Sequence, residues 1–262
     1  MPTPNHPRKK KDHTSPTTAR LSGKFAVVTG ANRGLGLAIA RALVREGCNV
    51  LITGRDRAAL SNAKKELQHL ATSHYPRPEI LAERCEVRDP DSVARVFSVV
   101  KKHWRRLHIL VNNAGISQPM HAAEETPVEL WRGVIDTNLN GMFYCTRAAL
   151  PLMPCGATIV NNLSVAAKQI FPKFSAYNAS KHGGLGFTLT LREELIPRGI
   201  RVTALMPGAA DTAIWNQFWP DAPRDKMISP ESVAQAVLYA VLLPLNANLQ
   251  ELLVVPLVGT LL

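Results

Sequence analysis

Three side chains in the second half of the chain could act together on one carbonyl oxygen, because they offer a phenol, an ammonium and a hydroxyl. Tyr177 and Lys181 are four residues apart, so on a helix they share one face. A free tyrosine has a pKa of about 10, and a lysine cation held close favours the phenolate and lowers that pKa. Ser164, expected at the end of a preceding strand, could donate a hydrogen bond to the same oxygen. The three residues predict acid–base chemistry at a carbonyl, provided that the chain also holds a hydride donor.

A glycine-rich turn near the N-terminus offers a place for such a donor. Residues 26–29 read as a short buried strand, residues 30–36 (G-A-N-R-G-L-G) as a tight turn, and residues 37–44 as a helix. This order forms the first half of a dinucleotide-binding βαβ unit, in which glycines let the backbone approach a pyrophosphate at the helix N-terminus. The turn alone also fits an ordinary loop, as the Tyr–Lys pair alone fits a solvated helix. Together they favour an enzyme that uses a dinucleotide.

The elements that would position these residues alternate along the chain, with apolar β-branched runs followed by helical patterns. This alternation is typical of a parallel sheet covered on both faces. We expect strands at residues 25–29, 49–53, 79–84, 108–112, 158–163, 201–206 and 251–255. We expect helices at residues 35–46, 57–70, 91–103, 127–150, 176–196 and 231–243. Right-handed crossovers then give a doubly wound, Rossmann-type α/β fold with seven parallel strands in one domain, residues 21–262.

The composition agrees with a single soluble domain. The chain has 262 residues, and a 46% share of hydrophobic residues permits a full core. No apolar run approaches the roughly 18 residues of a spanning helix, so we expect no membrane span. The four cysteines lack metal-ligand spacing, which predicts reduced thiols and no metal site. There is no apolar stretch of the kind found in signal peptides, so we expect a cytoplasmic protein.

The positive charge is partly concentrated in an N-terminal tail. Of the net charge of +11, residues 1–20 carry +4, from five basic residues against Asp12. This segment is rich in proline and poor in apolar residues, which predicts disorder. Residues 8–11 (R-K-K-K) could form a localisation signal or a phosphate-binding arm, and organelle targeting by the tail stays open. The remaining charge could attract an anionic cofactor or substrate, and we expect no nucleic-acid partner.

Five motifs, in order, resemble those of the short-chain dehydrogenase/reductase family, in its single-domain branch. The chain has T-G-x-x-x-G-x-G at 29–36, N-N-A-G at 112–115, an asparagine at Asn138, the set Ser164, Tyr177 and Lys181, and P-G-x-x-x-T at 207–212. The match runs from residue 22 to about residue 256, nearly the whole chain. The resemblance implies an oxidoreductase that interconverts a carbonyl and an alcohol by hydride transfer.

The same resemblance implies roles for individual residues. Ser164, Tyr177, Lys181 and Asn138 would form the catalytic set, with Lys181 also bonding the nicotinamide ribose. Asn138 would position a water that links Lys181 to solvent, and a buried polar or capping role for Asn138 is compatible with this. Thr212 would orient the carboxamide of the cofactor. The full set of expected cofactor contacts is Gly30, Asn32, Arg33, Gly34, Leu35, Gly36, Arg55, Asn113, Ala114, Gly115, Tyr177, Lys181, Pro207, Gly208 and Thr212.

The residues after the second strand indicate NADP rather than NAD. An enzyme that binds the free ribose 2′-hydroxyl needs an acidic residue there, whereas a 2′-phosphate needs positive charge. The family's acid would align with Gly54, and Arg55 follows it, while Arg33 lies inside the glycine turn. Two charge-assisted hydrogen bonds of roughly 1.5–3 kcal/mol each would favour NADP(H) strongly. Alternatively, Arg55 pairs with Asp56 or solvent. Glu86 departs from the Asp that contacts the adenine in many relatives.

The substrate and the assembly are less well defined by the sequence. The aromatic segment at 213–220 could cover an apolar aldehyde or ketone, or could pack against the core or a second subunit. Residues just beyond the motifs that could also face the substrate are Gln118, Lys168, Gln169 and Phe171. By resemblance, helices 127–150 and 176–196 would pair subunits in a homodimer or homotetramer. The apolar end, residues 257–262, fits a subunit contact or a frayed terminus.

Other functions remain open at this stage. A catalytically silent NADP-binding regulator would be expected to lack the tyrosine or the lysine, and both are present. A binder of anionic surfaces would depend on the basic tail. An epimerase or dehydratase could use the same three side chains.

Overall fold

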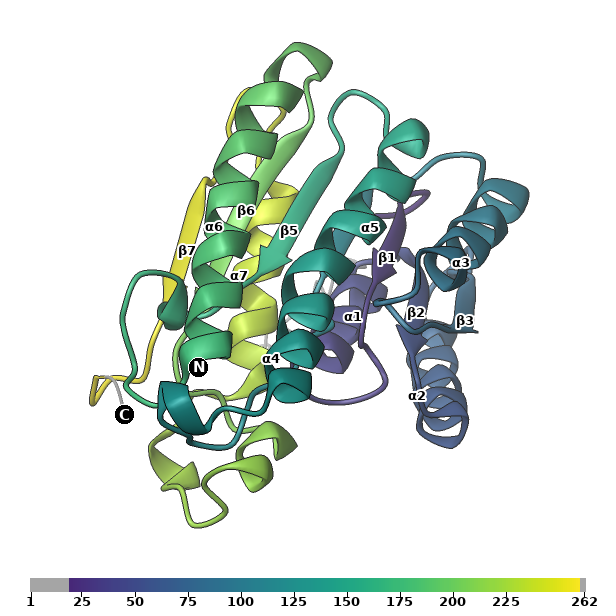
Figure 1. Cartoon of the computed structure of the whole chain (residues 1–262). Helices are drawn as coiled ribbons and strands as arrows, with labels where there is room; N and C mark the ends of the chain where they lie inside the picture. The colour runs from purple at the N-terminus through teal and green to yellow at the C-terminus, as the bar shows by residue number, and fades with distance from the viewer. Residues whose placement is uncertain (1–18, 260–262) are drawn as a thin grey trace, which may run out of the picture.

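The chain forms one seven-stranded parallel sheet with helices on both faces (Figure 1). The computed structural model describes residues 19–259. The strands lie in the order β3-β2-β1-β4-β5-β6-β7. Their bounds are β1 Phe25–Val28, β2 Asn49–Gly54, β3 Ile80–Arg84, β4 Ile109–Asn112, β5 Thr158–Asn162, β6 Arg201–Pro207 and β7 Glu251–Val254. All six neighbouring pairs are parallel. The predicted single-domain Rossmann-type fold is confirmed.

The helices begin at local signals that the sequence carries. They are α1 Gly34–Arg45, α2 Arg57–Leu70, α3 Pro90–His103, α4 Val128–Ile135, α5 Gly141–Ala149, α6 Ser175–Leu195 and α7 Pro230–Leu242. Asp56 caps α2, because its carboxylate accepts hydrogen bonds from the backbone N–H groups of Ala58 and Ala59 at 2.8 and 3.0 Å. Asp89 and Ser229 cap α3 and α7 in the same way, each followed by a proline in the first turn.

The helix expected at 127–150 is not continuous. A π-helical turn, Asp136–Asn140, separates α4 from α5. Asn138 lies in this turn, and its side-chain amide bonds the backbone N–H and C=O of Ile116. Single π-turns of this kind occur often at functional sites, because they redirect side chains without ending the helix. The hydrophobic period of the sequence does not reveal this turn.

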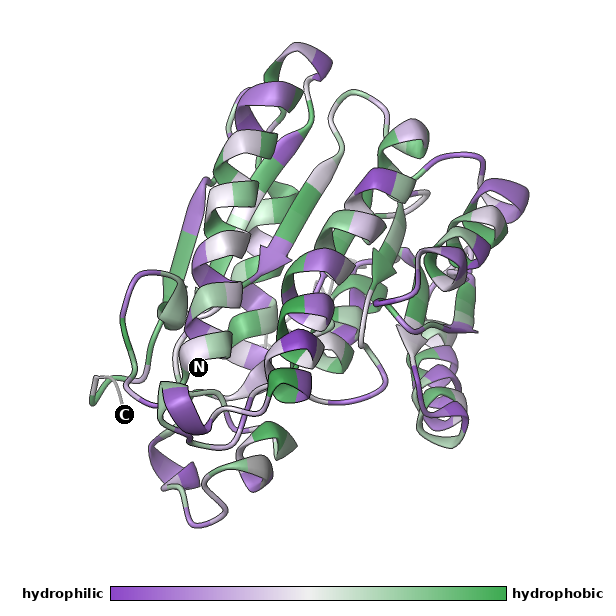
Figure 2. Ribbon diagram, in the orientation of Figure 1, coloured by the Kyte–Doolittle hydropathy of each residue, from purple (hydrophilic) through white to green (hydrophobic). Residues whose placement is uncertain are grey.

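The core consists of two apolar layers, one on each face of the sheet. Successive side chains of a strand point to opposite faces. Ala26 and Val28 therefore belong to the layer with α1, α2 and α7, and Val27 to the layer with α3, α5 and α6. Figure 2 shows hydrophobic residues along much of the strands and a mixture of hydrophobic and hydrophilic residues along the helices. Burial on both faces explains why the strands read as continuous apolar runs.

The connections reverse direction between β1 and β4. From β1 the chain winds outward to β2 and β3, then returns to place β4 on the other side of β1. In open α/β sheets a crevice forms at this reversal, outside the carboxyl ends of the strands. The motifs that were singled out in the sequence follow β1, β4, β5 and β6 at these ends. The fold therefore brings together segments that are far apart in the sequence.

The predictions for the N-terminal tail (residues 1–20) and for the apolar end (residues 257–262) fall mainly outside the described residues, which exclude 1–18 and 260–262. Arg20, the last basic residue of the predicted tail, is described, and its guanidinium pairs with the Glu46 carboxylate at 2.6 Å. Within residues 19–259, no helix has the length and apolar character needed to cross a bilayer. Three of the four cysteines are free and buried, and the fourth, Cys155, is free and exposed.

Candidate active site

A cleft of about 500 Å³ opens at the carboxyl ends of the strands. Most of the residues expected from the sequence line it. They are Gly30, Asn32, Arg33, Gly34, Leu35, Arg55, Asn113, Ala114, Gly115, Ser164, Tyr177, Lys181, Pro207, Gly208 and Thr212. Gly36 and Asn138 do not line the cleft and lie behind its wall. The structure thus gathers the proposed cofactor residues and the proposed catalytic residues along one cavity.

Two glycines of the turn after β1, Gly30 and Gly36, have no room for a side chain. A Cβ atom on Gly36 would lie 2.4 Å from Nδ2 of Asn113 and 2.6 Å from the carbonyl oxygen of Gly30. Gly30 has a positive φ of 62°, and its Cβ would lie 2.8 Å from Cα of Ala114. The turn is therefore packed directly against the segment after β4. Gly36 is required for this packing.

Hydrogen bonds tie this turn to the ends of β4 and β5. The Thr29 hydroxyl accepts hydrogen bonds from the backbone N–H groups of Asn113 and Ala114 at 2.9 and 3.0 Å. The Asn113 amide donates to the carbonyls of Thr29 and Gly30 and accepts from Nδ2 of Asn162 at 2.9 Å. Both ends of the Asn113 side chain are thus used within the protein. Thr29 and Asn162 were not predicted as site residues, because their partners come from distant strands.

Asn138 is buried behind the cleft and supports the backbone of the segment after β4. It is 2% exposed, and its Oδ1 accepts from the backbone N–H of Ile116 at 2.8 Å. Its Nδ2 donates to the Ile116 carbonyl at 2.9 Å and to the Ser180 hydroxyl at 3.0 Å, which in turn donates to the Tyr177 carbonyl. The buried polar role anticipated for Asn138 is confirmed. This network links the segment after β4 to the turn of α6 that carries Tyr177.

Tyr177 and Lys181 lie on the same face of α6, as their spacing predicts. The Lys181 ammonium is 5.4 Å from the centre of the Tyr177 ring and donates to the Asn162 carbonyl at 3.2 Å. Ser164 follows β5, and its hydroxyl oxygen accepts from the backbone N–H of Ala166 at 3.1 Å. That bond leaves the Ser164 hydrogen free to be donated. The three side chains therefore converge as expected, although no hydride donor belongs to the chain itself.

The pKa of Tyr177 is shifted in the opposite direction to the one expected. Part of the side chain stays accessible through the cleft, but the surrounding protein desolvates the phenol and raises its pKa. The hydrogen bond with Ser164 acts in the lowering direction and is outweighed. Burial also lowers the pKa of Lys181 to about 8. Tyr177 is thus kept protonated, which is the form that can donate a proton.

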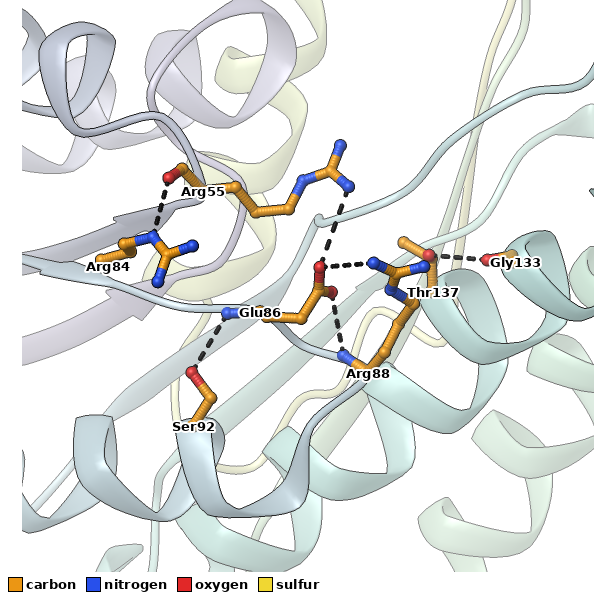
Figure 3. Close-up of polar contacts among 7 residues, drawn as sticks. All are labelled: Arg55, Arg84, Glu86, Arg88, Ser92, Gly133 and Thr137. Atoms are coloured by element: carbon orange, nitrogen blue, oxygen red, sulfur yellow. Dashed lines mark hydrogen bonds and ion pairs between the residues drawn. The ribbon is translucent and has the colours of Figure 1, made fainter.

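At the other end of the cleft, Arg55 pairs with Glu86 rather than with Asp56 (Figure 3). Its Nη1 lies 3.9 Å from Oε2 of Glu86, while Asp56 is used to cap α2. Glu86 also accepts from the Arg88 guanidinium at 2.8 Å and from the Arg88 backbone N–H at 3.2 Å. The pKa of Glu86 is lowered, chiefly by the hydrogen bond from Arg88. Arg55 is thereby held at the edge of the cleft.

Gly54, where the sequence analysis aligns an NAD-selecting acid, lies against the Asn32 side chain. A Cβ atom on Gly54 would lie 2.9 Å from the side-chain Cγ of Asn32. Asn32, from the glycine turn, packs over the end of β2. A side chain at position 54 would therefore require Asn32 to move.

Of the further residues considered for substrate contact, only Phe171 lines the cleft. Gln118 is fully buried, where its Oε1 accepts from the backbone N–H of Tyr177 and its Nε2 donates to the Lys173 carbonyl. Lys168 is exposed and pairs with Glu251 at 2.6 Å. Gln169 is exposed and does not line the cleft. Gln118 is thus a support for α6, which the sequence alone could not distinguish from a substrate ligand.

The aromatic segment after β6 packs on the chain itself and also faces the cleft. Trp215 is 6% exposed, and its indole N–H donates to the Ala210 carbonyl at 2.8 Å. It packs with Phe218 and Trp219 in a small apolar cluster. Ile214, Trp215 and Phe218 line the cleft. Packing against the chain itself is confirmed for Trp215, whereas a role as a substrate cover stays a prediction.

A doubly wound sheet with this turn after β1 and a Ser–Tyr–Lys set at the switch point defines an oxidoreductase of the Rossmann type. The chain belongs to the short-chain dehydrogenase/reductase family. The family model described as short chain dehydrogenase matches residues 24–223.

Relatives of known sequence and structure extend over the same region. An uncharacterized oxidoreductase of Staphylococcus saprophyticus is 32% identical over 90% of this chain and 98% of its own length. A short chain dehydrogenase from Burkholderia cenocepacia in complex with NADP is 29% identical, with a TM-score of 0.80 over 90% of this chain and 97% of that one. Actinorhodin polyketide ketoreductase with NADPH is 30% identical, with a TM-score of 0.79 over 90% of this chain and 98% of that one.

Proposed function

We propose that this protein is an NADP(H)-dependent oxidoreductase that interconverts an aldehyde or ketone and an alcohol. The observation that carries the proposal is the placement of Ser164, Tyr177 and Lys181 in the same cleft as the glycine turn after β1. The name of the related ketoreductase, and the NADP or NADPH present in both solved relatives, support the same reaction class.

Unpaired polar atoms in the cleft support a dinucleotide as its ligand. Among the described residues, Oγ1 of Thr53 and Oδ1 of Asn162 are buried without a hydrogen-bond partner, and both residues line the cleft. Buried polar atoms of this kind are costly unless a ligand or water satisfies them. The turn at Gly30 and the N-terminus of α1 would hold the pyrophosphate. Arg33 and Arg55 would bind the 2′-phosphate.

In the reductive direction, bound NADPH supplies the hydride that is added to the carbonyl carbon. Tyr177 donates its phenolic proton to the carbonyl oxygen, and its raised pKa keeps that proton in place until the oxygen becomes basic. Ser164 donates a hydrogen bond to the same oxygen. Lys181 stabilises the phenolate that Tyr177 becomes, since its ammonium lies 5.4 Å from the ring. Asn138 acts on this step through the backbone of Ile116 and through Ser180.

Subunit pairing through α4, α5 and α6 is part of the proposal. Large apolar side chains are exposed on these helices, among them Trp131 and Phe143. Exposed apolar groups on neighbouring helices are typical of a protein interface. A homodimer or homotetramer would bury them.

The experiment that tests the proposal follows NADPH and NADH oxidation by the purified protein with a panel of aldehydes and ketones. We expect NADPH to be consumed in preference to NADH. Tyr177→Phe, which keeps the ring and removes the proton, is expected to lower kcat by at least about 100-fold. Isothermal calorimetry with NADPH serves as the control, because this variant keeps every other expected cofactor contact. Equal turnover by Tyr177→Phe would assign the proton transfer to another group.

A further inference from the structure

A continuous aromatic wall leads from the proposed acid to the segment that follows β6. The ring of Phe174 meets that of Tyr177 edge to face, with centroids 6.4 Å apart. Phe174 also meets Phe218 edge to face at 5.4 Å, and Phe218 lies 5.0 Å from Trp215. We call Phe174, Phe218 and Trp215 the aromatic wall, and all three line the cleft.

The wall is held in place by bonds that do not depend on a ligand. Phe174 is 4% exposed, and Trp215 is fixed by its hydrogen bond to the Ala210 carbonyl. Arg224 ties the start of the segment, because its guanidinium donates to the Thr212 carbonyl and to the Asn216 side chain, both at 2.6 Å. A preformed apolar surface loses little conformational entropy when a ligand binds.

Among the described residues, Lys181 is the one charged side chain that lines this end of the cleft. The other charged side chains that line the cleft are Arg33, Arg55, Asp56 and Glu86. All four follow β1, β2 or β3, on the proposed nucleotide side. Lys168 and Arg224 lie near the wall in sequence but outside the cleft lining, where they pair with Glu251 and Asp211.

The polar side chains available to a substrate are therefore few. Among the described lining residues, Asn113 and Thr137 already bond within the protein, and Asn162 and Thr212 are assigned to the proposed cofactor. This leaves the hydroxyls of Ser117, Ser164 and Tyr177, with the Lys181 ammonium, for a substrate. The remaining side chains there are apolar, and they include Val165, Phe171 and Ile214. Such a site can satisfy one carbonyl oxygen, but a carboxylate or a polyhydroxylated chain would lose its hydration without compensation.

We propose that the substrate is an uncharged carbonyl compound that carries an aromatic ring. The proposal rests on the carbonyl–alcohol reaction proposed above and specifies its substrate class. The ring packs against the aromatic wall in offset or edge-to-face contact, and the carbonyl group points to Tyr177 and Ser164. Hydride passes from NADPH to the carbonyl carbon, the proton passes from Tyr177 to the oxygen, and the products are an aryl carbinol and NADP⁺.

The first test compares three methyl ketones in NADPH turnover: acetophenone, cyclohexyl methyl ketone, which has a similar size, and para-acetylbenzoate, which adds a carboxylate. We expect kcat/KM for acetophenone to exceed that for the cyclohexyl compound about fivefold, from aromatic contacts alone. We expect it to exceed that for the carboxylate by at least about 100-fold, because the buried charge has no partner. Equal or higher kcat/KM for the carboxylate would overturn the substrate class while leaving the reaction class standing.

The second test removes one ring from the wall. Phe218→Leu keeps an apolar side chain, and we expect it to reduce the preference for acetophenone over cyclohexyl methyl ketone about threefold or more. The matched control is Tyr75→Leu, since Tyr75 is fully exposed and lies outside the cleft lining. NADPH affinity, measured by calorimetry, is expected to be the same in both variants. An unchanged ratio in Phe218→Leu would overturn the role of the wall.

A binding measurement separates failure of this inference from failure of the proposed reaction. Acetophenone and para-acetylbenzoate are titrated into the protein saturated with NADP⁺. Selective binding of acetophenone that is weakened by Phe218→Leu supports the role of the aromatic wall. If such binding occurs without turnover of any carbonyl compound, only the proposed reaction is contradicted. Binding of neither ketone, or stronger binding of the carboxylate, overturns the inference whatever the turnover.

Discussion

Lys181 is a buried base whose charge depends on its surroundings. Burial lowers its pKa from 10.5 to about 8. Between these two values the unfolded chain binds more protons at this site than the folded chain, so the shift makes stability rise with pH in this range. Below pH 8 both states are protonated, and the full cost of burying the ammonium is present. Loss of the proton from Lys181 therefore increases the stability of the folded protein.

This linkage predicts a pH-dependent difference between the wild type and Lys181→Met. From pH 8 to pH 9.5 the free energy of unfolding of the wild type should rise relative to the variant by about 1–2 kcal/mol. Urea denaturation at the two pH values measures it, and the window ends below the range in which Tyr177 ionises. Lys102→Met, an exposed substitution on α3, controls for the loss of any lysine. A constant difference would mean that Lys181 is hydrated in the folded protein.

Arg33 and Arg55 predict the choice between the two nicotinamide cofactors. Substitution of either by glutamine should weaken NADPH binding about tenfold, a value reduced because both side chains are exposed, and should change NADH binding little. Glu86→Gln should act in the opposite direction, because it removes a negative charge 3.9 Å from Arg55. Calorimetric dissociation constants for both cofactors measure these effects. Equal losses of NADPH and NADH affinity would place these arginines away from the 2′-phosphate.

Among the elements, the π-helical turn between α4 and α5 has a structural task. It brings the Asn138 amide to three partners, the N–H and C=O of Ile116 and the hydroxyl of Ser180. Asn138→Ala would leave these buried groups unpaired and should cost about 3 kcal/mol of stability. Asn140→Ala, in the same turn, removes one bond to Asp136 and should cost less than about 1 kcal/mol. Urea denaturation compares the two, and equal losses would show that the turn, and not the Asn138 network, stabilises this region.

Some elements and contacts of this protein could be predicted from the sequence, and others could not. Strands buried on both faces and helices with caps such as Asp56 carry their own local signals, so their order and approximate bounds could be predicted. The glycine turn and the Tyr177–Lys181 pair could be predicted because their spacing is local. The partners of Asn162 and Gln118 could not, since they depend on which strand ends meet across the sheet.

The direction of the Tyr177 pKa shift also could not be predicted from the sequence. The sequence supplies the neighbouring lysine but not the burial, and burial decides the sign. The pairing of Arg55 with Glu86 was missed for a similar reason. Asp56 is adjacent in sequence, but its carboxylate is already engaged by the N-terminus of α2, whereas Glu86 reaches Arg55 from the end of the neighbouring strand β3.

At the scale of the whole molecule, the cleft and the proposed subunit contact use different parts of the fold. The cleft is built from strand ends, the turns that follow them and the first turns of α6, whereas Trp131, Phe143 and Leu189 are exposed on α4, on α5 and further along α6. Phe143 meets Phe187 of α6 edge to face, with ring centroids 6.0 Å apart. Because Phe143 does not line the cleft, a change there should alter assembly without directly altering cofactor contacts.

Phe143→Lys is therefore expected to convert the assembled protein to the 28.7 kDa chain, because a charge in the centre of an apolar contact has no partner. Sedimentation equilibrium measures the mass, and NADPH affinity measured on the same samples should stay within about threefold, since cofactor contacts come from one chain. Tyr75→Lys places the same charge on a fully exposed ring away from these helices and should leave the mass unchanged. A wild type that already sediments as a single chain, or a Phe143→Lys variant of unaltered mass, would contradict pairing through α4, α5 and α6. Loss of NADPH binding together with assembly would instead mean that the partner subunit shapes the cleft.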